Sequence, residues 1–376
     1  MALNSFGTAL RSWIKGVIQP TLFTHMEECS RTIYTEQEKK LLAILEVVGV
    51  EQYVTHRRDN QWLGRPLKER EAVARAFLAK LIMKFRDTKQ LRLNLLSNQN
   101  LRIICGFDSL NSVPSESSFS RAFKEFASAN LGEVVHKAMV AKHLGSHLLG
   151  HVSHDSSAIR AREKPVKRLK KAKLPKKRGR PKKGEEIHPV EPKRLDIQKS
   201  QTPEEILAAL PKECDRSGKK GSKGDTEFWR GYKFHCAVND NGFPIVGVAT
   251  SASLHDSQAM MYTMKEATTR VSYLYDLADA AYDAHQIKEQ SKELGHVPVI
   301  DPNHSGGKDA VPMAPHEKER YKERTVVERF FSRLKDEFGG DHIMVRGHAK
   351  VSLHLMFGAI AIFADQVIRL AMIETV

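Results

Sequence analysis

Residues 321–335 read YKERTVVERFFSRLK, and this stretch carries the clearest structural signal in the chain. On a helix that advances by about 100° per residue, its apolar side chains form one face that packs on a core. Four of its polar side chains form a stripe about 60° wide directly beside that face, and they are Tyr321, Arg324, Glu328 and Lys335. The stretch therefore predicts a helix that presents a phenol, a guanidinium, a carboxylate and an ammonium along the edge of a core.

These polar groups are suited to binding a cation and a phosphodiester together. Carboxylate oxygens such as those of Glu328 are ligands for hard cations, while guanidinium and ammonium groups bind phosphate oxygens. Arg324 and Glu328 are also spaced as an ordinary i, i+4 ion pair on an exposed helix. The spacing alone leaves both interpretations open: a metal- and phosphate-binding edge, or a salt-bridged amphipathic helix.

Two aspartates at the ends of predicted strands are candidates to complete a carboxylate site with Glu328. Asp155 follows the strand in GHVSHDSS, and Asp279 ends the strand in YLYDLAD. Carboxylates from two strand ends and one helix can hold two Mg²⁺ ions about 4 Å apart. A lone aspartate at a strand end is more often a cap or turn residue. Three other aspartates compete for the second position, namely Asp256, Asp276 and Asp283.

Hydrophobic periodicity predicts a helical first part and a mixed second part. Helices are expected over residues 36–48, 67–85, 116–129 and 131–144, and later over 257–269, 284–294, 315–338 and 351–373. Strands are expected over residues 149–155, 228–238, 244–251, 273–279 and 297–300, with Asp240-Asn241-Gly242 as a hairpin turn. This order predicts an α/β protein with an RNase H-like domain, a mixed five-stranded sheet flanked by helices, behind an all-helical N-terminal domain.

The positive charge of the chain is concentrated in one segment. Between Arg160 and Lys183 there are 14 Lys or Arg and one Glu, so +13 of the total +15 falls within 24 residues. Such a block repels itself and needs a polyanion, although a solubilising linker is the alternative. We therefore expect a helical domain at 1–145 and a catalytic domain at 146–376, with a basic, partly disordered insertion at about 160–225 that contains a short helix near 201–210.

Within the basic segment, the core Arg178-Gly179-Arg180-Pro181 resembles an AT-hook. Gly allows close approach of the backbone, Pro keeps the chain extended, and arginines favour the negative potential of a narrow minor groove. Such a core also arises by chance in a Lys/Arg-rich stretch. A nonspecific phosphate tether is therefore the main alternative, and a nuclear-localisation signal is a weaker one.

The spacing Tyr321-x2-Arg324-x3-Glu328-x6-Lys335 resembles the signature of DDE transposases from bacterial insertion sequences. The resemblance is to the group named after insertion sequence 4, including its insertion-sequence-5-like relatives. Five further blocks resemble this group and stand in the expected order, over roughly residues 148–158 and 226–365. They are SHDSSAI around Asp155, WRGYKFHCAVNDNGFPI from Trp229, SLHDSQ around Asp256, LADAAYDA around Asp279, and RGHAKVSLHLMFGAIA.

This resemblance implies a metal-binding triad of Asp155, Asp279 and Glu328 that uses Mg²⁺, with Mn²⁺ as a substitute. It implies that Tyr321, Arg324 and Lys335 contact transposon-end DNA. The enzyme would hydrolyse the 3′ ends of an element and transfer the freed 3′-hydroxyls into target DNA. Its partners would be the double-stranded DNA of terminal inverted repeats and target, and a second copy of the chain in a synaptic homodimer.

The interval between Asp279 and Glu328 departs from the pattern of some relatives. It spans only 49 positions and contains no Trp, whereas those relatives carry a strand-rich insertion there with a Trp that stacks on a flipped base. The resemblance therefore does not imply a hairpin intermediate, and the processing of the second strand stays open.

Other basic residues are candidates for DNA contact. The stretch VPSESSFSRAFKEF resembles a segment of the N-terminal domain of these transposases, and its Arg121 and Lys124 are candidates to read the terminal repeat on a helix. A plain packing helix is equally compatible with this pattern. Lys233, beside the predicted hairpin, is a further candidate.

Composition limits the class of protein. The four cysteines form no C-x-x-C pair and the histidines form no H-E-x-x-H motif, so we expect neither a disulfide framework nor a zinc site. No secretory signal or long apolar run is evident, so we expect a cytoplasmic protein without a membrane partner. The resemblance implies that it is bacterial and nucleoid-associated. Two alternatives to an active transposase remain: a domesticated, non-catalytic DNA-binding protein and an RNase H-like nuclease without strand transfer.

Overall fold

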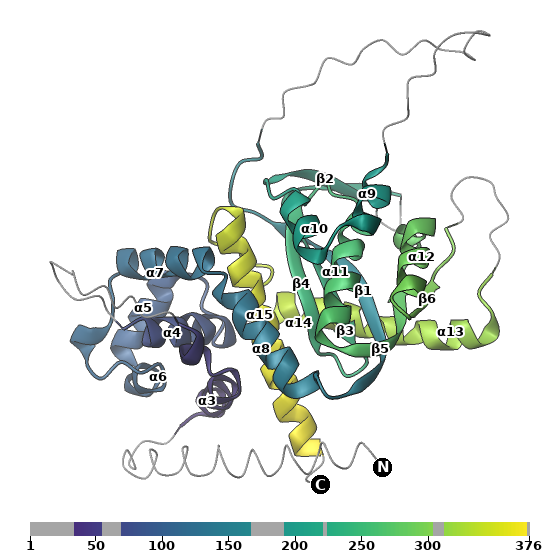
Figure 1. The fold of residues 1–376 in the computed structure, drawn as a ribbon. Coiled ribbons are helices and arrows are strands. Elements are labelled where there is room, and N and C mark those ends of the chain that lie inside the picture. The colour runs from purple at the N-terminus through teal and green to yellow at the C-terminus, as the bar shows by residue number, and fades with distance from the viewer. Residues whose placement is uncertain (1–33, 55–68, 167–191, 221–223, 304–311, 374–376) are drawn as a thin grey trace, which may run out of the picture.

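The computed structural model describes residues 34–54, 69–166, 192–220, 224–303 and 312–373. Figure 1 shows a helical part and a sheet part, with α8 and α15 lying between them. The AT-hook-like Arg178 and Arg180 lie outside the described residues.

Side-chain caps begin four of the described helices of the helical part, namely α3, α5, α6 and α7. Ser115 caps α7, and the side chain of Thr35 caps α3 in a reciprocal pair with Glu38. On α7, Phe119 and Phe123 pack against Phe77 of α4, with ring centroids 5.6 and 4.6 Å apart. The helices are α3 (Glu36–Val48), α4 (Arg70–Ile82), α5 (Thr88–Ser97), α6 (Gln99–Ile104), α7 (Glu116–Ser128) and α8 (Leu131–Leu144), with short 3-10 turns η2 (Val50–Tyr53) and η3 (Leu110–Ser112).

The sheet has the RNase H-like arrangement that the element order predicts, with one strand more than expected. Strands β1, β5 and β6 run parallel, and β3 joins the opposite edge of β1 antiparallel and pairs with β4 as a hairpin. The additional strand β2 extends this edge by pairing with the first half of β3. The strands are β1 (Leu148–Arg160), β2 (Asp215–Lys220), β3 (Thr226–Asn239), β4 (Pro244–Ser251), β5 (Ser272–Ala278) and β6 (Val297–Ile300).

At Gly231 the strand that pairs with β3 changes from β2 to β4. Before it β3 pairs with β2, and after it with β4, while β1 lies along the other side. Its φ is +148°, and a Cβ there would lie 2.1 Å from the carbonyl oxygen of Ile159. Only glycine therefore fits at position 231, where β3 pairs with both β1 and β2.

Helices cover the sheet and join it to the helical part. On one face, Phe331 of α14 packs on Phe234 of β3 with ring centroids 6.5 Å apart. The predicted helix over 315–338 is divided by a 3-10 turn, so that it forms α13, η5 and α14. The elements are α9 (Arg194–Ser200), α10 (Pro203–Ala209), α11 (Asp256–Arg270), η4 (Ala280–Tyr282), α12 (His285–Glu293), α13 (Pro315–Tyr321), η5 (Lys322–Arg324), α14 (Thr325–Asp336) and α15 (His348–Ile373).

The long helix α15 is the shared core of both parts. It contacts α3, α4, α7 and α8 of the helical part and β4 of the sheet. By length and composition His348–Met372 could cross a membrane, but 83% of its most apolar window is buried inside the protein. Its apolar surface is thus used in packing, as in the core helix of a soluble protein.

Candidate active site

Strand register brings Asp155 and Asp279 to the same edge of the sheet. In the parallel pair β1 and β5, Val152 lies opposite Asp276 and Ser153 opposite Leu277. Continued by two residues, this register places Asp155 beside Asp279, where β5 has ended. Asp155 is not at a strand end as the sequence predicts, because β1 continues to Arg160 by pairing with β3. The carboxyl ends of parallel strands are where α/β folds gather functional side chains.

Alternation along β1 sends neighbouring side chains to opposite faces of the sheet. His154 contacts Thr263 of α11, while the Asp155 carboxylate faces Arg324, which directly precedes α14. Asp155 is therefore presented on the side of the sheet where α14 carries Glu328. Asp279 caps η4 by accepting a hydrogen bond of 2.9 Å from the N–H of Ala281.

Arg324 links the two strands to the helix. One of its guanidinium nitrogens lies 3.7 Å from Asp155 Oδ2, and another donates a hydrogen bond to Glu328. Its guanidinium also lies 5.6 Å from the centre of the Tyr321 ring. Tyr321, Arg324 and Glu328 thus stay together as the sequence predicts, even though a 3-10 turn replaces the continuous helix.

The carboxylates at this edge are crowded. Burial and the charge of Asp279 together raise the pKa of Asp155 to about 6, against a hydrogen bond from Ser156 N–H and the charge of Arg324. Burial likewise raises the pKa of Asp279, although the Ala281 N–H and Arg324 oppose it. The edge therefore holds more negative charge than its buried surroundings favour.

Two further aspartates border the pair. Asp256, at the start of α11, accepts hydrogen bonds from Ser156 Oγ at 2.7 Å and from Lys233 Nζ at 2.9 Å. Asp301 follows β6 and raises the pKa of Asp279. From the sequence, Asp256 was only a competitor for the second position, and Asp301 was missed. The signal for Asp301 was present, because it follows a predicted strand as Asp155 and Asp279 do.

Asp276 and Asp283 take other places. Asp276 is fully buried and lies 3.0 Å from His154 Nε2 and 3.2 Å from His296 Nδ1. Burial acts to raise its pKa, but hydrogen bonds from these two histidines hold that pKa well below its usual range. Asp283 forms an ion pair of 2.6 Å with Lys288. Asp276 is thus part of the core, on the opposite face from Asp155.

The donor set suits a hard cation. Oxygen ligands from aspartate and glutamate are those that Mg²⁺ and Mn²⁺ prefer. Among the described residues, no group of three or more His, Cys, Asp or Glu side chains is close enough to hold a metal ion. Arg324 supplies the positive charge next to Asp155 and Glu328. The crowded carboxylates of Asp155 and Asp279 are donors that fit a cation, whereas Glu328 is paired with Arg324 in this structure.

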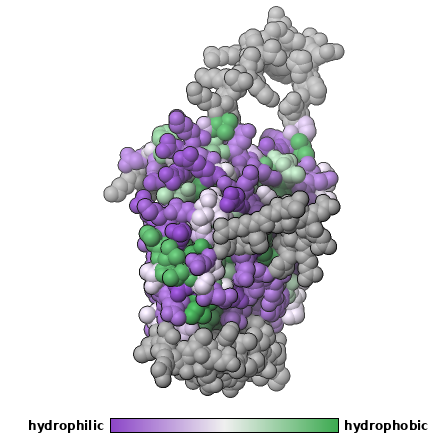
Figure 2. All heavy atoms as spheres, turned by 90° about the vertical axis from the view of Figure 1, so that its left-hand side faces the viewer, coloured by the Kyte–Doolittle hydropathy of each residue, from purple (hydrophilic) through white to green (hydrophobic). Residues whose placement is uncertain are grey.

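The predicted DNA-contacting residues fall into three places within the described residues. Tyr321 and Arg324 adjoin the carboxylates, and Lys335 lies further along α14. Lys233 donates to Asp256 and to the carbonyl oxygen of Leu254. Arg121 and Lys124 are exposed on α7, on the helical part, whose outer face is mostly hydrophilic (Figure 2). The structure therefore gathers Tyr321, Arg324 and Lys233 near the carboxylates and leaves Arg121 and Lys124 apart.

Two protein-family models match the chain. The family described as transposase DDE domain matches residues 147–364, which include the whole sheet, α14 and most of α15. The family described as transposase domain (DUF772) matches residues 34–125, which include α3 to most of α7. No curated protein and no solved structure matches the chain.

Proposed function

The chain belongs to the transposase DDE domain family, which consists of polynucleotidyl transferases, and from this premise we propose how it acts. It cuts the ends of a DNA element and joins their 3′-hydroxyls to target DNA, with Asp155, Asp279 and Glu328 as metal-binding carboxylates. The observation that carries this proposal is the register that sets Asp155 beside Asp279, at the edge where Arg324 connects Asp155 to Glu328.

Asp155, Asp279 and Glu328 would hold Mg²⁺, or Mn²⁺ in its place. Divalent ions bound there would activate the attacking oxygen and stabilise the leaving oxygen of the phosphodiester. The raised pKa values of both aspartates indicate excess negative charge that a divalent cation relieves. This agrees with the transposase family, whose members typically depend on such ions.

Arg324 exchanges partners in this proposal. In the free protein its guanidinium neutralises Asp155 and Glu328. When a DNA end binds, the guanidinium turns to a phosphate oxygen and frees both carboxylates for the cation. Tyr321, stacked beside it, keeps the guanidinium at the site edge. Lys233 holds Asp256 in place next to Ser156, and the same ammonium is within the site for contact with DNA.

The remaining predicted contacts extend the DNA surface. Arg121 and Lys124 on α7 would read the terminal inverted repeat, and Arg178 and Arg180 would enter an A·T-rich minor groove. Residues 1–145 would form the end-binding and dimerisation domain, and two copies would synapse two ends. The Tyr321-x2-Arg324-x3-Glu328-x6-Lys335 spacing supports the insertion-sequence-4 and insertion-sequence-5 type, and the nucleoid is the expected location.

The experiment that tests this function measures joining as well as cutting. Purified protein is incubated with Mg²⁺, a supercoiled target plasmid and a labelled duplex that carries the DNA flanking its gene. We expect 3′-end cleavage and covalent joint products that migrate with the plasmid. Cleavage without joining would make the protein a nuclease, and binding without cleavage would make it a domesticated DNA-binding protein.

A further inference from the structure

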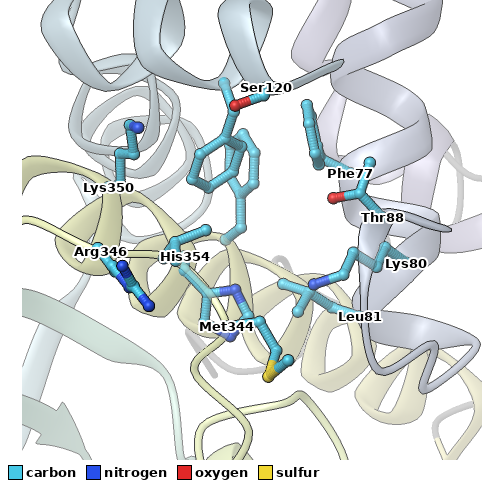
Figure 3. A pocket seen from close by; sticks show the side chains of 12 residues that line it. Phe77, Lys80, Leu81, Thr88, Ser120, Met344, Arg346, Lys350 and His354 are labelled. Carbon is cyan, nitrogen blue, oxygen red and sulfur yellow. The ribbon is translucent and has the colours of Figure 1, made fainter. Parts of the chain in front are cut away.

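A cavity of about 290 Å³ lies at the seam between the helical part and the C-terminal segment. Figure 3 shows it between α4 and α7 on one side and the start of α15 on the other. Three cationic side chains line it, Lys80 from α4 and Arg346 and Lys350 from the segment around the start of α15. The hydroxyls of Thr88 and Ser120 also line it, and no Asp or Glu does.

Lys80 is the unusual member of this set. It is only 6% exposed, and no hydrogen bond or ion pair joins its ammonium to another described residue. Figure 3 shows its nitrogen directed into the cavity. Burial lowers the pKa of Lys80 to about 8, so the ammonium is still charged near neutral pH. Burying this ammonium is costly, and the charge of Asp87 offsets only part of that cost.

The other two cations are equally free to bind an anion. Neither Arg346 nor Lys350 forms an ion pair with a described residue, and both approach the cavity from the side opposite Lys80 in Figure 3. His354, which also lines the cavity, donates to the carbonyl oxygen of Gly339 at 2.9 Å. Burial and the charge of Lys80 lower the pKa of His354 to about 4, so this ring is neutral and adds no competing charge.

The cavity adjoins a second hollow whose wall includes the C-terminal end of α14, the helix that carries Glu328. This hollow, of about 380 Å³, shares Lys80, Leu81 and His354 with the first and is also lined by Lys84, Arg86 and Lys335. Of the three carboxylates on its wall, Glu337 is paired with Arg333. Lys335 lies seven residues after Glu328 on α14, which is about 10 Å along the helix. Lys335 thus places a basic side chain of the Glu328 helix on the wall of this second hollow.

We propose that this seam binds a backbone phosphate of the DNA substrate, held between Lys80 on one side and Arg346 and Lys350 on the other. The inference deepens the proposed function, because the DNA is the same end that the carboxylates would cut. A phosphate at the seam would fix the helical part and the catalytic part to one register on the DNA.

Equilibrium DNA binding, measured without catalysis, tests the seam separately from the chemistry. The probe is a fluorescein-labelled duplex of the gene-flanking DNA, titrated in EDTA at several salt concentrations. The variants are Lys80→Met, which keeps the shape and removes the charge, and the double variant Arg346→Gln/Lys350→Gln. Lys292→Gln, an exposed lysine on α12, is the matched control. Melting of each protein is followed with and without inorganic phosphate.

We expect Lys80→Met to weaken binding by about tenfold or more and to lower the salt slope by about 0.9, as when one phosphate is no longer neutralised. Its melting temperature without DNA should not fall, because the substitution removes a buried charge that is only partly compensated. The double variant should also weaken binding and lower the slope, and the control should do neither.

The proposal would be overturned if Lys80→Met bound DNA with the affinity and salt slope of the wild-type protein. It would also be overturned if inorganic phosphate raised the melting temperature of the wild-type protein while the variants bound DNA as tightly as the wild type does. If Lys80→Met unfolds, the surface double variant decides, and wild-type binding by it overturns the proposal. An absence of cleavage by the wild-type protein in Mg²⁺ would instead contradict the proposed function and leave this result standing.

Discussion

Arg324 is the residue that organises the candidate site in the free protein. Its guanidinium stands next to Asp155 and donates to Glu328, so that two of the three proposed ligands share one positive charge. Burial acts to lower its pKa, but the charges of Tyr321, Asp155 and Glu328 raise it overall, and the group stays charged. The spacing of Tyr321, Arg324, Glu328 and Lys335 thus has a physical consequence: the arginine neutralises the carboxylates of Asp155 and Glu328.

At the residue scale, replacing the carboxylates should remove cleavage but not binding. Asp155→Asn, Asp279→Asn and Glu328→Gln each remove a cation ligand, and we expect Mg²⁺-dependent cleavage to fall roughly a thousandfold or more. Affinity for duplex DNA in EDTA should stay within a few fold. Glu323→Gln, an exposed change near Glu328, is the control and should cut normally. Full activity in Asp279→Asn would show that the site is wrongly assigned.

Asp276 should act on stability. Its carboxylate accepts from Tyr273, His154 and Ser291 within the core. We expect Asp276→Asn to lower the free energy of unfolding by roughly 3 kcal/mol, because it breaks a buried charged network. Urea denaturation measures this change, and Asp283→Asn, which removes only a partly exposed ion pair, should cost less than about 1 kcal/mol. If both substitutions lowered the free energy of unfolding by the same small amount, the hydrogen-bonded network around Asp276 would contribute little to stability.

At the scale of elements, long amphipathic or strongly apolar segments were predictable. The helices at 36–48 and 131–144 and the strands at 244–251 and 297–300 have the predicted bounds. The strand β2 was missed because its sequence DRSGKK lacks apolar alternation, and it is a strand only because the first half of β3 pairs with it. The turn η5 was missed because Lys, Glu and Arg are all good helix formers.

The candidate site, like the elements, was predictable from the sequence only in part. Arg324 and Glu328 lie four residues apart, so their local spacing identifies them as candidates. Asp155 is a candidate because it ends a predicted strand, although β1 continues beyond it to Arg160. The choice between Asp276 and Asp279 depended on which face each occupies, and that follows from the register with β1, which no single segment contains. The seam around Lys80 depends on packing between residues more than 260 positions apart, so no local pattern could predict it.

Gly231, where β3 pairs with both β1 and β2, gives a prediction about the stability of this part of the sheet. Gly231→Ala places a methyl group against the carbonyl of Ile159 and strains a positive φ, so we expect a loss of about 3 kcal/mol in unfolding free energy. Gly295→Ala is the matched control, since its φ is +86° but nothing lies within 4 Å of the added atom. It should cost about 1 kcal/mol. Equal losses would show that strain, not the close approach, sets the cost at Gly231.

At the scale of the whole molecule, positive charge lies both on the folded domains and in the basic segment that begins at Arg160. The first residues of the insertion are folded against the domain. Glu163 accepts hydrogen bonds from Tyr232 and from the N–H of Gly347. The N–H of Val166 donates to the carbonyl oxygen of Cys214. A deletion from Arg160 would therefore damage the domain. The cations that can be removed safely are those between Lys167 and Lys183.

Replacing the 11 Lys and Arg of residues 167–183 by Gln should weaken DNA binding and flatten its dependence on salt. The slope of log affinity against log salt should fall by about 0.9 for every phosphate that the protein no longer neutralises. Fluorescence polarisation in salt from about 50 to 200 mM measures this slope. An unchanged slope would show that the segment does not meet DNA.

The central claim is that Asp155, Asp279 and Glu328 share divalent cations. The most direct measurement is a crystal structure of the complex with end DNA and Mn²⁺, with data collected at the manganese absorption edge. We predict anomalous density between these three carboxylates, with Arg324 turned from Glu328 to a phosphate oxygen. Manganese bound elsewhere, with Arg324 still paired to Glu328 while DNA lies in the site, would contradict the claim.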